Sequence, residues 1–154
     1  MGDFFNDDNF NEKSEMKAMD MDWGKPGDYL LGTFVKARHG IETQYGKNSI
    51  YEILAERGAT HRLVGKGRMA KPVDDVTMIN KGEVWSLWGR GDIFCGQMNS
   101  LRPGQIVKIA FTEEKEGKNG PWKDVKIFAP MGNDGKPLMN QEYVDNLGVT
   151  GADM

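Results

Sequence analysis

The chain has 154 residues, a formal net charge of −3 and a single cysteine, Cys95. This length favours one domain with a real hydrophobic core, and one cysteine excludes an internal disulfide. With only His39 and His61 beside Cys95, the four close Cys or His ligands of a structural zinc site are missing. We therefore expect no metal and no cofactor.

No apolar run approaches the roughly 20 residues that a membrane-crossing helix needs. The N-terminus is acidic, which is untypical of secretory signals and transit peptides. We therefore expect a cytoplasmic protein, in the host cell cytoplasm if it is viral, with no membrane contact.

The net charge conceals a division along the chain. Residues 1–28 carry eight acids and three lysines, residues 29–128 carry sixteen bases and eleven acids, and residues 129–154 carry four acids and one lysine. A basic middle lies between acidic ends, and binding partners respond to the local field more than to the total.

The two ends lack sustained hydrophobic periodicity. Residues 1–28 close in a Gly/Pro break and are predicted to form a flexible acidic N-terminal arm. Its tip, "DFFNDDNF", either folds back onto the domain or docks a protein partner. After Pro130 the chain is rich in Gly, Asn and Asp, and residues 131–154 are interpreted as a C-terminal tail of undefined role.

Between the ends, residues 29–130 contain the short strand-like segments that are typical of a β domain. "YLLGTFVKAR" predicts a strand with a bulge or strong coil at Gly32, and "SIYEILAE" predicts a second strand, with a helix as the alternative. Residues 57–82 are mixed: "HRLVG" could extend a hairpin, and "GKGRMAKPVDD" is expected to be a loop.

The remaining elements follow in order. "EVWSLWG" predicts a strand, and "DIFCGQMNSL" predicts a short helix with Asp92 as N-cap and Ile93, Met98 and Leu101 near one face. "GQIVKIAFTEE" and "PWKDVKIFAP" predict two more strands joined by a hairpin loop. Five strands with a short helix between the third and fourth is the order of the OB-fold, a Greek-key barrel that often binds oligonucleotides.

Two patterns in the basic middle are typical of nucleic-acid binding. Residues 57–71 hold five cations and no acid, and aromatic rings are interleaved with Lys and Arg elsewhere. Bases stack on rings and phosphates pair with cations, so this combination favours a single strand. The predicted phosphate contacts are Lys36, Arg38, Arg57, Arg62, Lys66, Arg68, Lys71, Arg90 and Lys123.

The predicted stacking residues are Phe34, Tyr51, Trp85, Trp88 and Trp122. Strand alternation groups Phe34 with Lys36 and Arg38, which we assign to the ligand side. Alternation alone leaves open which of Trp85 and Trp88 faces outward. Arg90 shares the parity of Trp88, which favours Trp88.

No catalytic constellation is recognised, so the protein is not expected to be an enzyme. "VGKGRMAK" lacks the glycine and the Ser or Thr of a phosphate-binding P-loop. Cys95 with a histidine could in principle be a nucleophile and its base, but a lone cysteine after Phe94 is more typical of a core residue.

Residues 29–130 resemble bacteriophage-type single-stranded DNA-binding proteins of the OB-fold family. The likeness rests on "GDYLLGTFVKA", "EVWSLWGRGDIFCGQMNSLRPGQIVKIAF" and "NGPWKDVKIFAP". The resemblance implies a non-catalytic protein that coats and protects single strands during DNA replication, recombination and repair. Many such proteins recruit replication enzymes through an acidic, aromatic-tipped tail, which is usually C-terminal; here the N-terminal tip matches it in composition.

Two other readings remain open. A protein–protein adaptor barrel of a replisome or virion would use the basic face to dock an acidic partner and would not bind oligonucleotides. An RNA-binding OB protein would prefer RNA through contacts to the 2′-hydroxyl. Exposed barrel edges are also compatible with a homo-oligomer.

Overall fold

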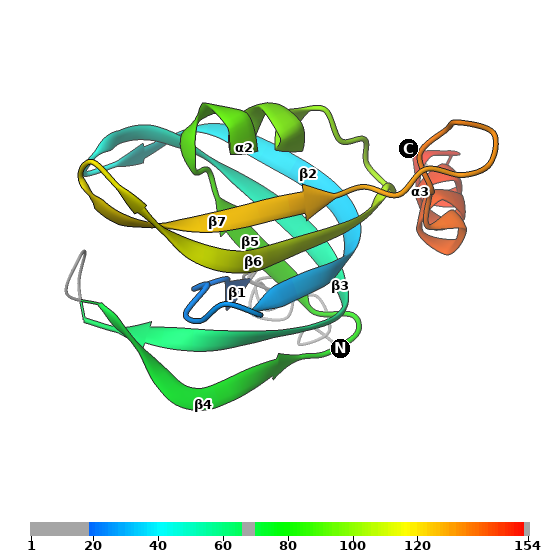
Figure 1. Cartoon of the computed structure of the whole chain (residues 1–154). Coiled ribbons are helices and arrows are strands. Elements are labelled where there is room, and N and C mark those ends of the chain that lie inside the picture. Colours follow the sequence, from blue (N-terminus) through cyan, green and yellow to red (C-terminus); the bar gives the residue numbers. More distant parts are fainter. Residues whose placement is uncertain (1–18, 66–69, 153–154) are drawn as a thin grey trace, which may run out of the picture.

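The computed structural model describes residues 19–65 and 70–152, and this part of the chain is mostly β (Figure 1). Its elements in chain order are β1 (Met19–Asp20), β2 (Tyr29–Thr43), β3 (Gly46–Val64), β4 (Lys71–Ile79), β5 (Val84–Trp88), α2 (Gly91–Asn99), β6 (Ile106–Gly117), β7 (Gly120–Phe128) and α3 (Gln141–Ala152). The all-β expectation is confirmed. No helix in the described residues is long and apolar enough to cross a membrane.

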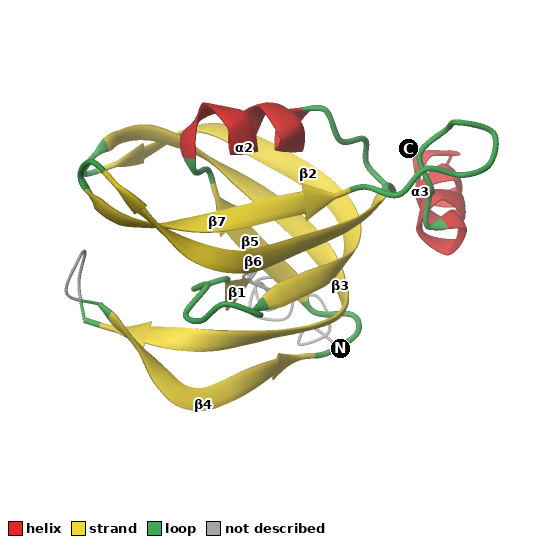
Figure 2. Ribbon diagram, in the orientation of Figure 1, coloured by secondary structure: helices red, strands yellow, loops and turns green. Residues whose placement is uncertain are grey.

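The strands form one sheet that curls into an open half-barrel (Figure 2). Its order is β1-β5-β3-β2-β6-β7, with β4 joined to the outer part of β3. The pairs are antiparallel except for β1 with β5, which is parallel. A closed five-stranded barrel also needs its third and fifth strands to meet, and no pairing between β5 and β7 occurs in the described residues.

The core fills the concave side of this sheet. Each long strand turns alternate apolar side chains inward, and α2 covers one opening of the half-barrel with Phe94 and Met98. Burying a large apolar side chain stabilises a fold by about 1.5–3 kcal/mol. The fully buried aliphatic residues from the strands are Leu30, Ile53, Leu87, Val107 and Ile109.

The pairing of β2 with β3 is irregular at two places before Arg38, and the second decides which side chains of β2 face the core. The pairing shifts between Leu31 and Gly32, where a bulge or strong coil was predicted, but the extra residue is Glu56 on β3 and not a residue of β2. The pairing shifts again between Phe34 and Lys36. The extra residue there reverses the alternation, so Phe34 is buried whereas Lys36 is exposed.

Replacing Gly32 with alanine is expected to destabilise the protein by about 1–3 kcal/mol, because overpacking forces a backbone shift. A Cβ atom at this position would lie 2.3 Å from the carbonyl oxygen of Leu54 on the neighbouring strand. Urea denaturation measures the effect. Gly96→Ala is the control: its Cβ would have nothing within 4 Å, so stability should be unchanged or raised. Equal stability of Gly32→Ala and the wild type would contradict the prediction.

The suggestion that "HRLVG" extends a hairpin is confirmed, whereas the second half of "GKGRMAKPVDD", expected to be a loop, belongs to strand β4. β3 continues to Val64 and pairs with β4 from Gly58↔Ile79 to Val64↔Lys71. Most of β4 is exposed, so its sequence carries no alternation of apolar and polar residues and resembles a loop. We call residues 58–79 the ribbon; its residues 66–69 lie outside the described part of the chain.

Residues 19–28, which we call the strap, pack against the sheet rather than extending as the end of a flexible arm. The amide of Met21 donates to Ser86 O (3.0 Å) on β5, and that of Gly27 donates to Phe111 O (2.8 Å) on β6. Met21 and Trp23 are buried in the core. Residues 1–18, including the "DFFNDDNF" tip, lie outside the described residues.

The segment after β7 also has defined structure, unlike the tail we expected. Isolated bridges join Gln105 to Met139 and Met131 to Pro137. The Asn140 side chain donates to Thr33 Oγ1 (2.8 Å), and α3 follows directly. Polar anchors of this kind leave little hydrophobic pattern in a sequence.

Helix α2 occurs where it was predicted but begins differently. Arg90 occupies its N-cap position and forms no side-chain cap, while Asp92 lies in the first turn. Phe94 and Met98 face the core, and Ile93 is exposed. The predicted cap is wrong, because the N-cap lies two residues earlier than Asp92. The predicted face is right at Met98 and Leu101 and wrong at Ile93, because Phe94, four residues before Met98, shares its side of the helix.

Candidate functional site

A cleft of about 420 Å³ lies between the start of α2 and strand β7. We call it the β7 cleft; it is lined by Arg90, Gly91, Asp92, Ile93, Phe94, Gln97, Trp122, Lys123, Asp124 and Val125. The chain must turn sharply from β5 into α2 here, and Gly91 takes a φ of 71° that glycine adopts without strain. The turn places Arg90 at the cleft.

Arg90 and Lys123 bring two positive charges together in this cleft. Burial lowers the pKa of Arg90, and burial together with the charge of Arg90 lowers the pKa of Lys123. Within residues 19–65 and 70–152, neither side chain forms an ion pair with a carboxylate. Two like charges in a partly desolvated cleft favour a bound anion, and the carboxylates of Asp92 and Asp124, which also line the cleft, offset part of their potential.

Two of the tryptophans are exposed, and one of them lies in the β7 cleft. Trp122 lines the β7 cleft and is 49% exposed. Trp88, two residues before Arg90, is 36% exposed, whereas Trp85 is 4% exposed. The preference for Trp88 as the outward tryptophan is therefore confirmed, while any role of either ring in stacking stays a prediction.

Lys115 modifies the surroundings of Trp122. Its ammonium lies 5.6 Å from the centre of the Trp122 ring and 3.2 Å from the carboxylate of Asp124. Asp124 raises the pKa of Lys115, with a smaller contribution from Glu113. The cation–π contact holds a charged lysine beside the exposed ring.

Trp88 lines a second, separate hollow. It is lined by Thr43, Tyr45, Lys47, Asn48 and Trp88 at the turn between β2 and β3. Tyr45 is 88% exposed, and we did not include it or Lys47 among the predicted site residues. Their signal in the sequence was a ring and a cation flanking a turn glycine in "QYGK".

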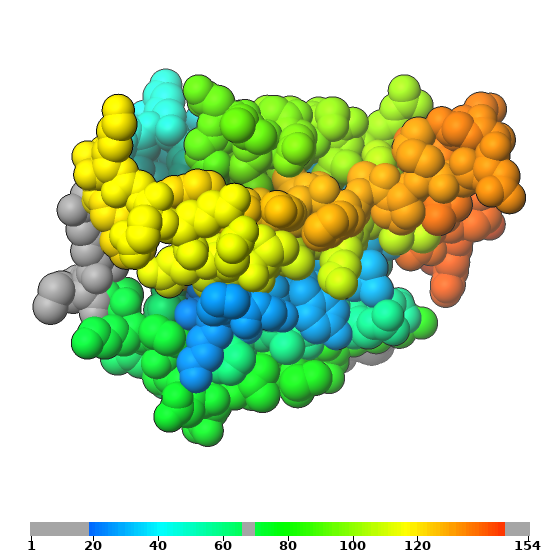
Figure 3. Space-filling model, viewed as in Figure 1, coloured from blue at the N-terminus to red at the C-terminus, as the bar shows by residue number. Residues whose placement is uncertain are grey.

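A third hollow lies between the ribbon and the β6–β7 hairpin. It is lined by Gly24, Leu63, Ala70, Pro72, Glu114, Asn119, Gly120, Pro121 and Lys123. Lys123 also lines the β7 cleft, so the two hollows meet at its side chain. Figure 3 shows the strap (blue) at the surface between the β6–β7 hairpin (yellow) and the ribbon (green).

Three of the five predicted stacking residues are buried in the core. Phe34 faces the core like Leu30, Tyr51 is fully buried, and Trp85 faces the core from β5. The bulge after Phe34 turns Lys36 and Arg38 outward. The hydroxyl of Tyr51 donates to Asn99 Oδ1 (3.0 Å), and burial is the main cause that raises its pKa to about 12. As they stand, these three rings cannot act as outward platforms.

The predicted phosphate contacts are scattered. Lys36 and Arg38 are exposed but share the carboxylate of Glu52, at 3.6 Å and 3.8 Å. Arg62 and Lys71 lie in the outer half of the ribbon, far along β3 from Arg57. Arg90 and Lys123 are the pair that the fold brings together. Lys66 and Arg68 lie outside the described residues.

Both histidines already have polar partners. His39 Nδ1 lies 2.7 Å from Ser49 Oγ, and His61 Nδ1 lies 2.7 Å from the buried carboxylate of Asp28. Cys95 is partly buried and packs against the core. In the described residues, no group of three or more His, Cys, Asp or Glu side chains could hold a metal ion.

Comparison with known proteins finds no matching family model, no matching curated protein and no matching solved structure.

Proposed function

We propose that this protein binds single-stranded DNA with little sequence preference and without catalysis, in the manner of a bacteriophage-type replication, recombination and repair protein. One observation carries the proposal. The half-buried cations Arg90 and Lys123, which lack a carboxylate partner among the described residues, lie in one cleft with the exposed ring of Trp122.

The architecture supports the proposal that the half-barrel is a variant of the OB-fold. Its antiparallel neighbours β5-β3-β2-β6-β7, with α2 placed before β6, match the strand neighbours of that barrel apart from closure. The strap pairs with β5 at the edge that the last strand would otherwise reach. On this proposal the strap takes the place of the closing pairing.

The chemistry favours a single strand over a duplex. Exposed rings such as Trp88, Trp122 and Tyr45 can stack on bases only when those bases are free of their own partners. Stacking tolerates any base, since every base has a π-face, and phosphates meet Arg90 and Lys123 whatever the sequence. Both features predict weak sequence preference and strong salt dependence.

Titration with oligo-dT, followed by tryptophan fluorescence at low and high salt, tests the proposal. We expect quenching by the single strand, because Trp88 and Trp122 stack on bases, and weaker binding at high salt. Duplex DNA should quench little, and oligo-U compared with oligo-dT measures any preference for RNA. The proposal fails if neither single strand changes the fluorescence or binds in an independent anisotropy assay.

A second candidate function, protein docking, is favoured by the ribbon. Its side chains Val64, Val76 and Met78 are 54%, 47% and 60% exposed, which is unusual for a strand pair on a monomer. On this alternative the barrel is an adaptor of a replisome or virion and binds no oligonucleotide, so the same titration separates the two.

A further inference from the structure

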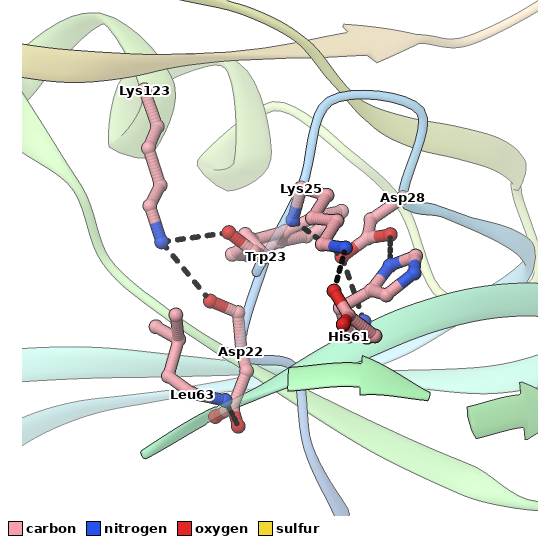
Figure 4. Close-up of polar contacts among 8 residues, drawn as sticks. Asp22, Trp23, Lys25, Asp28, His61, Leu63 and Lys123 are labelled. Carbon is pink, nitrogen blue, oxygen red and sulfur yellow. Dashed lines mark hydrogen bonds and ion pairs between the residues drawn. The ribbon is translucent and has the colours of Figure 1, made fainter. Parts of the chain in front are cut away.

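Lys123 is held in place by the main chain of the strap. Its ammonium donates to the carbonyl oxygen of Trp23 (2.7 Å) and contacts that of Asp22 (3.4 Å), although these residues lie about a hundred positions earlier (Figure 4). A lysine has a flexible four-carbon stem and strongly prefers water. Two carbonyl partners oppose that preference and keep the charge at the cleft.

Carboxylates of the strap fix those carbonyls on the sheet. Asp22 accepts a hydrogen bond from the amide of Leu63 (2.9 Å) on β3. Asp28 accepts from the amide of His61 (2.8 Å) and contacts its ring nitrogen (2.7 Å). Figure 4 shows both carboxylates directed from the strap toward β3, with Lys123 approaching from the opposite side.

The strap carbonyls hold Lys123 close to Arg90, a residue of like charge. Burial is the main cause that lowers the pKa of Lys123, and the charge of Arg90 lowers it further, while the charges of Glu114, Asp22 and Asp28 act in the opposite direction. Without the strap carbonyls, Lys123 would gain both hydration and distance from Arg90 by swinging outward. The carbonyls therefore offset the cost of holding the two charges together before a ligand arrives.

We propose that the strap is a positioning element of the ligand site: residues 22 and 23 hold Lys123 beside Arg90, so that strap docking and the binding of a phosphate chain are coupled. This inference rests on the proposed binding of single-stranded DNA. The strap acts on the ligand through Lys123, because its own cation, Lys25, forms an ion pair with Asp74 (3.0 Å). Because such coupling is reciprocal, the bound strand must also stabilise the docked strap.

Two substitutions at one position test the coupling. Asp22→Ala and Asp22→Asn both remove a negative charge beside a phosphate site, so simple electrostatics predicts tighter binding by both. The asparagine can still accept from the Leu63 amide through its side-chain oxygen, and the alanine cannot. We expect Asp22→Asn to bind oligo-dT as well as the wild type or better, and Asp22→Ala to bind about fivefold or more weakly.

A double-mutant cycle with Lys123→Met tests whether the strap affects DNA binding through Lys123. If the strap acts through Lys123, Asp22→Ala should weaken binding in the wild type and have little further effect in Lys123→Met. The salt slope for the single strand should fall by about 0.7 in Lys123→Met, as for one lost phosphate contact, and by a similar amount in Asp22→Ala. Additive losses, or tighter binding by Asp22→Ala, would overturn the inference while leaving DNA binding intact.

Hydrogen exchange in the wild type covers the case in which Asp22→Ala does not fold. Oligo-dT should slow exchange at the amides of Met21 and Gly27, which bond to β5 and β6, and should do so much less in Lys123→Met. DNA that binds without protecting these amides overturns the coupling. If wild-type protein does not bind oligo-dT at all, the proposed function fails first and the inference falls with it.

Discussion

Replacing Trp23 with alanine is expected to lower the free energy of unfolding by about 3–5 kcal/mol, the usual cost of removing a large aromatic side chain from a core. Trp23 is 2% exposed and belongs to the same buried cluster as Trp85 and Leu87. The loss would therefore come from a cavity at the centre of the half-barrel, not from a loosened terminus. Urea denaturation followed by circular dichroism measures it.

Trp122→Ala is the matched control, since it deletes the same side chain from an exposed position on β7. Its stability should stay within about 1 kcal/mol of the wild type, because little apolar surface is lost from the core and surface changes are usually mild. If Trp23→Ala is no more destabilising than Trp122→Ala, the strap does not belong to the cooperative fold.

The second large effect concerns binding. The double variant Trp88→Ala/Trp122→Ala is expected to lose about 2–6 kcal/mol of affinity for oligo-dT, since each stacked base is worth about 1–3 kcal/mol. The remaining Trp23 and Trp85 are buried, so the fluorescence of this variant should no longer respond to oligo-dT. Fluorescence anisotropy of a labelled oligonucleotide gives the affinity without relying on tryptophan.

Phe128→Ala provides the comparison for this variant. Phe128 is 47% exposed on β7, like Trp122, but pairs with Lys108 at the end of the strand away from the β6–β7 turn. Its removal should leave affinity unchanged. An equal loss in Phe128→Ala would mean that exposed aromatic surface of any kind contributes, and unchanged affinity in the double variant would exclude stacking on these tryptophans.

Features with a local cause could be predicted from the sequence. The predominance of strands in residues 29–130, an irregular pairing at Gly32 and a short helix before β6 follow from composition, glycine placement and apolar spacing. The outward position of Trp88 followed from its parity with Arg90. Each depends on neighbours within a few residues, where propensity and periodicity carry information.

Features that depend on residues far apart in the chain could not be predicted from the sequence. Phe34 was assigned to the ligand side with Lys36 because strict alternation was assumed, and one extra residue between them places the two on opposite faces. Tyr51 and Trp85 looked equally suitable for stacking until the curl of the sheet enclosed them. The strap was hidden because its partners, Ser86, Phe111 and Lys123, lie far along the chain and its own sequence is short and acidic.

The parallel pairing of β1 with β5 has a consequence for the order of events during synthesis. The strap leaves the ribosome before every strand that it contacts, and its docking surface is incomplete until β5, β6 and Lys123 have followed. Its contacts are all of long sequence separation, so they form late and at high entropic cost. A nascent chain of this protein must therefore keep Trp23 exposed until nearly the whole sheet has been made.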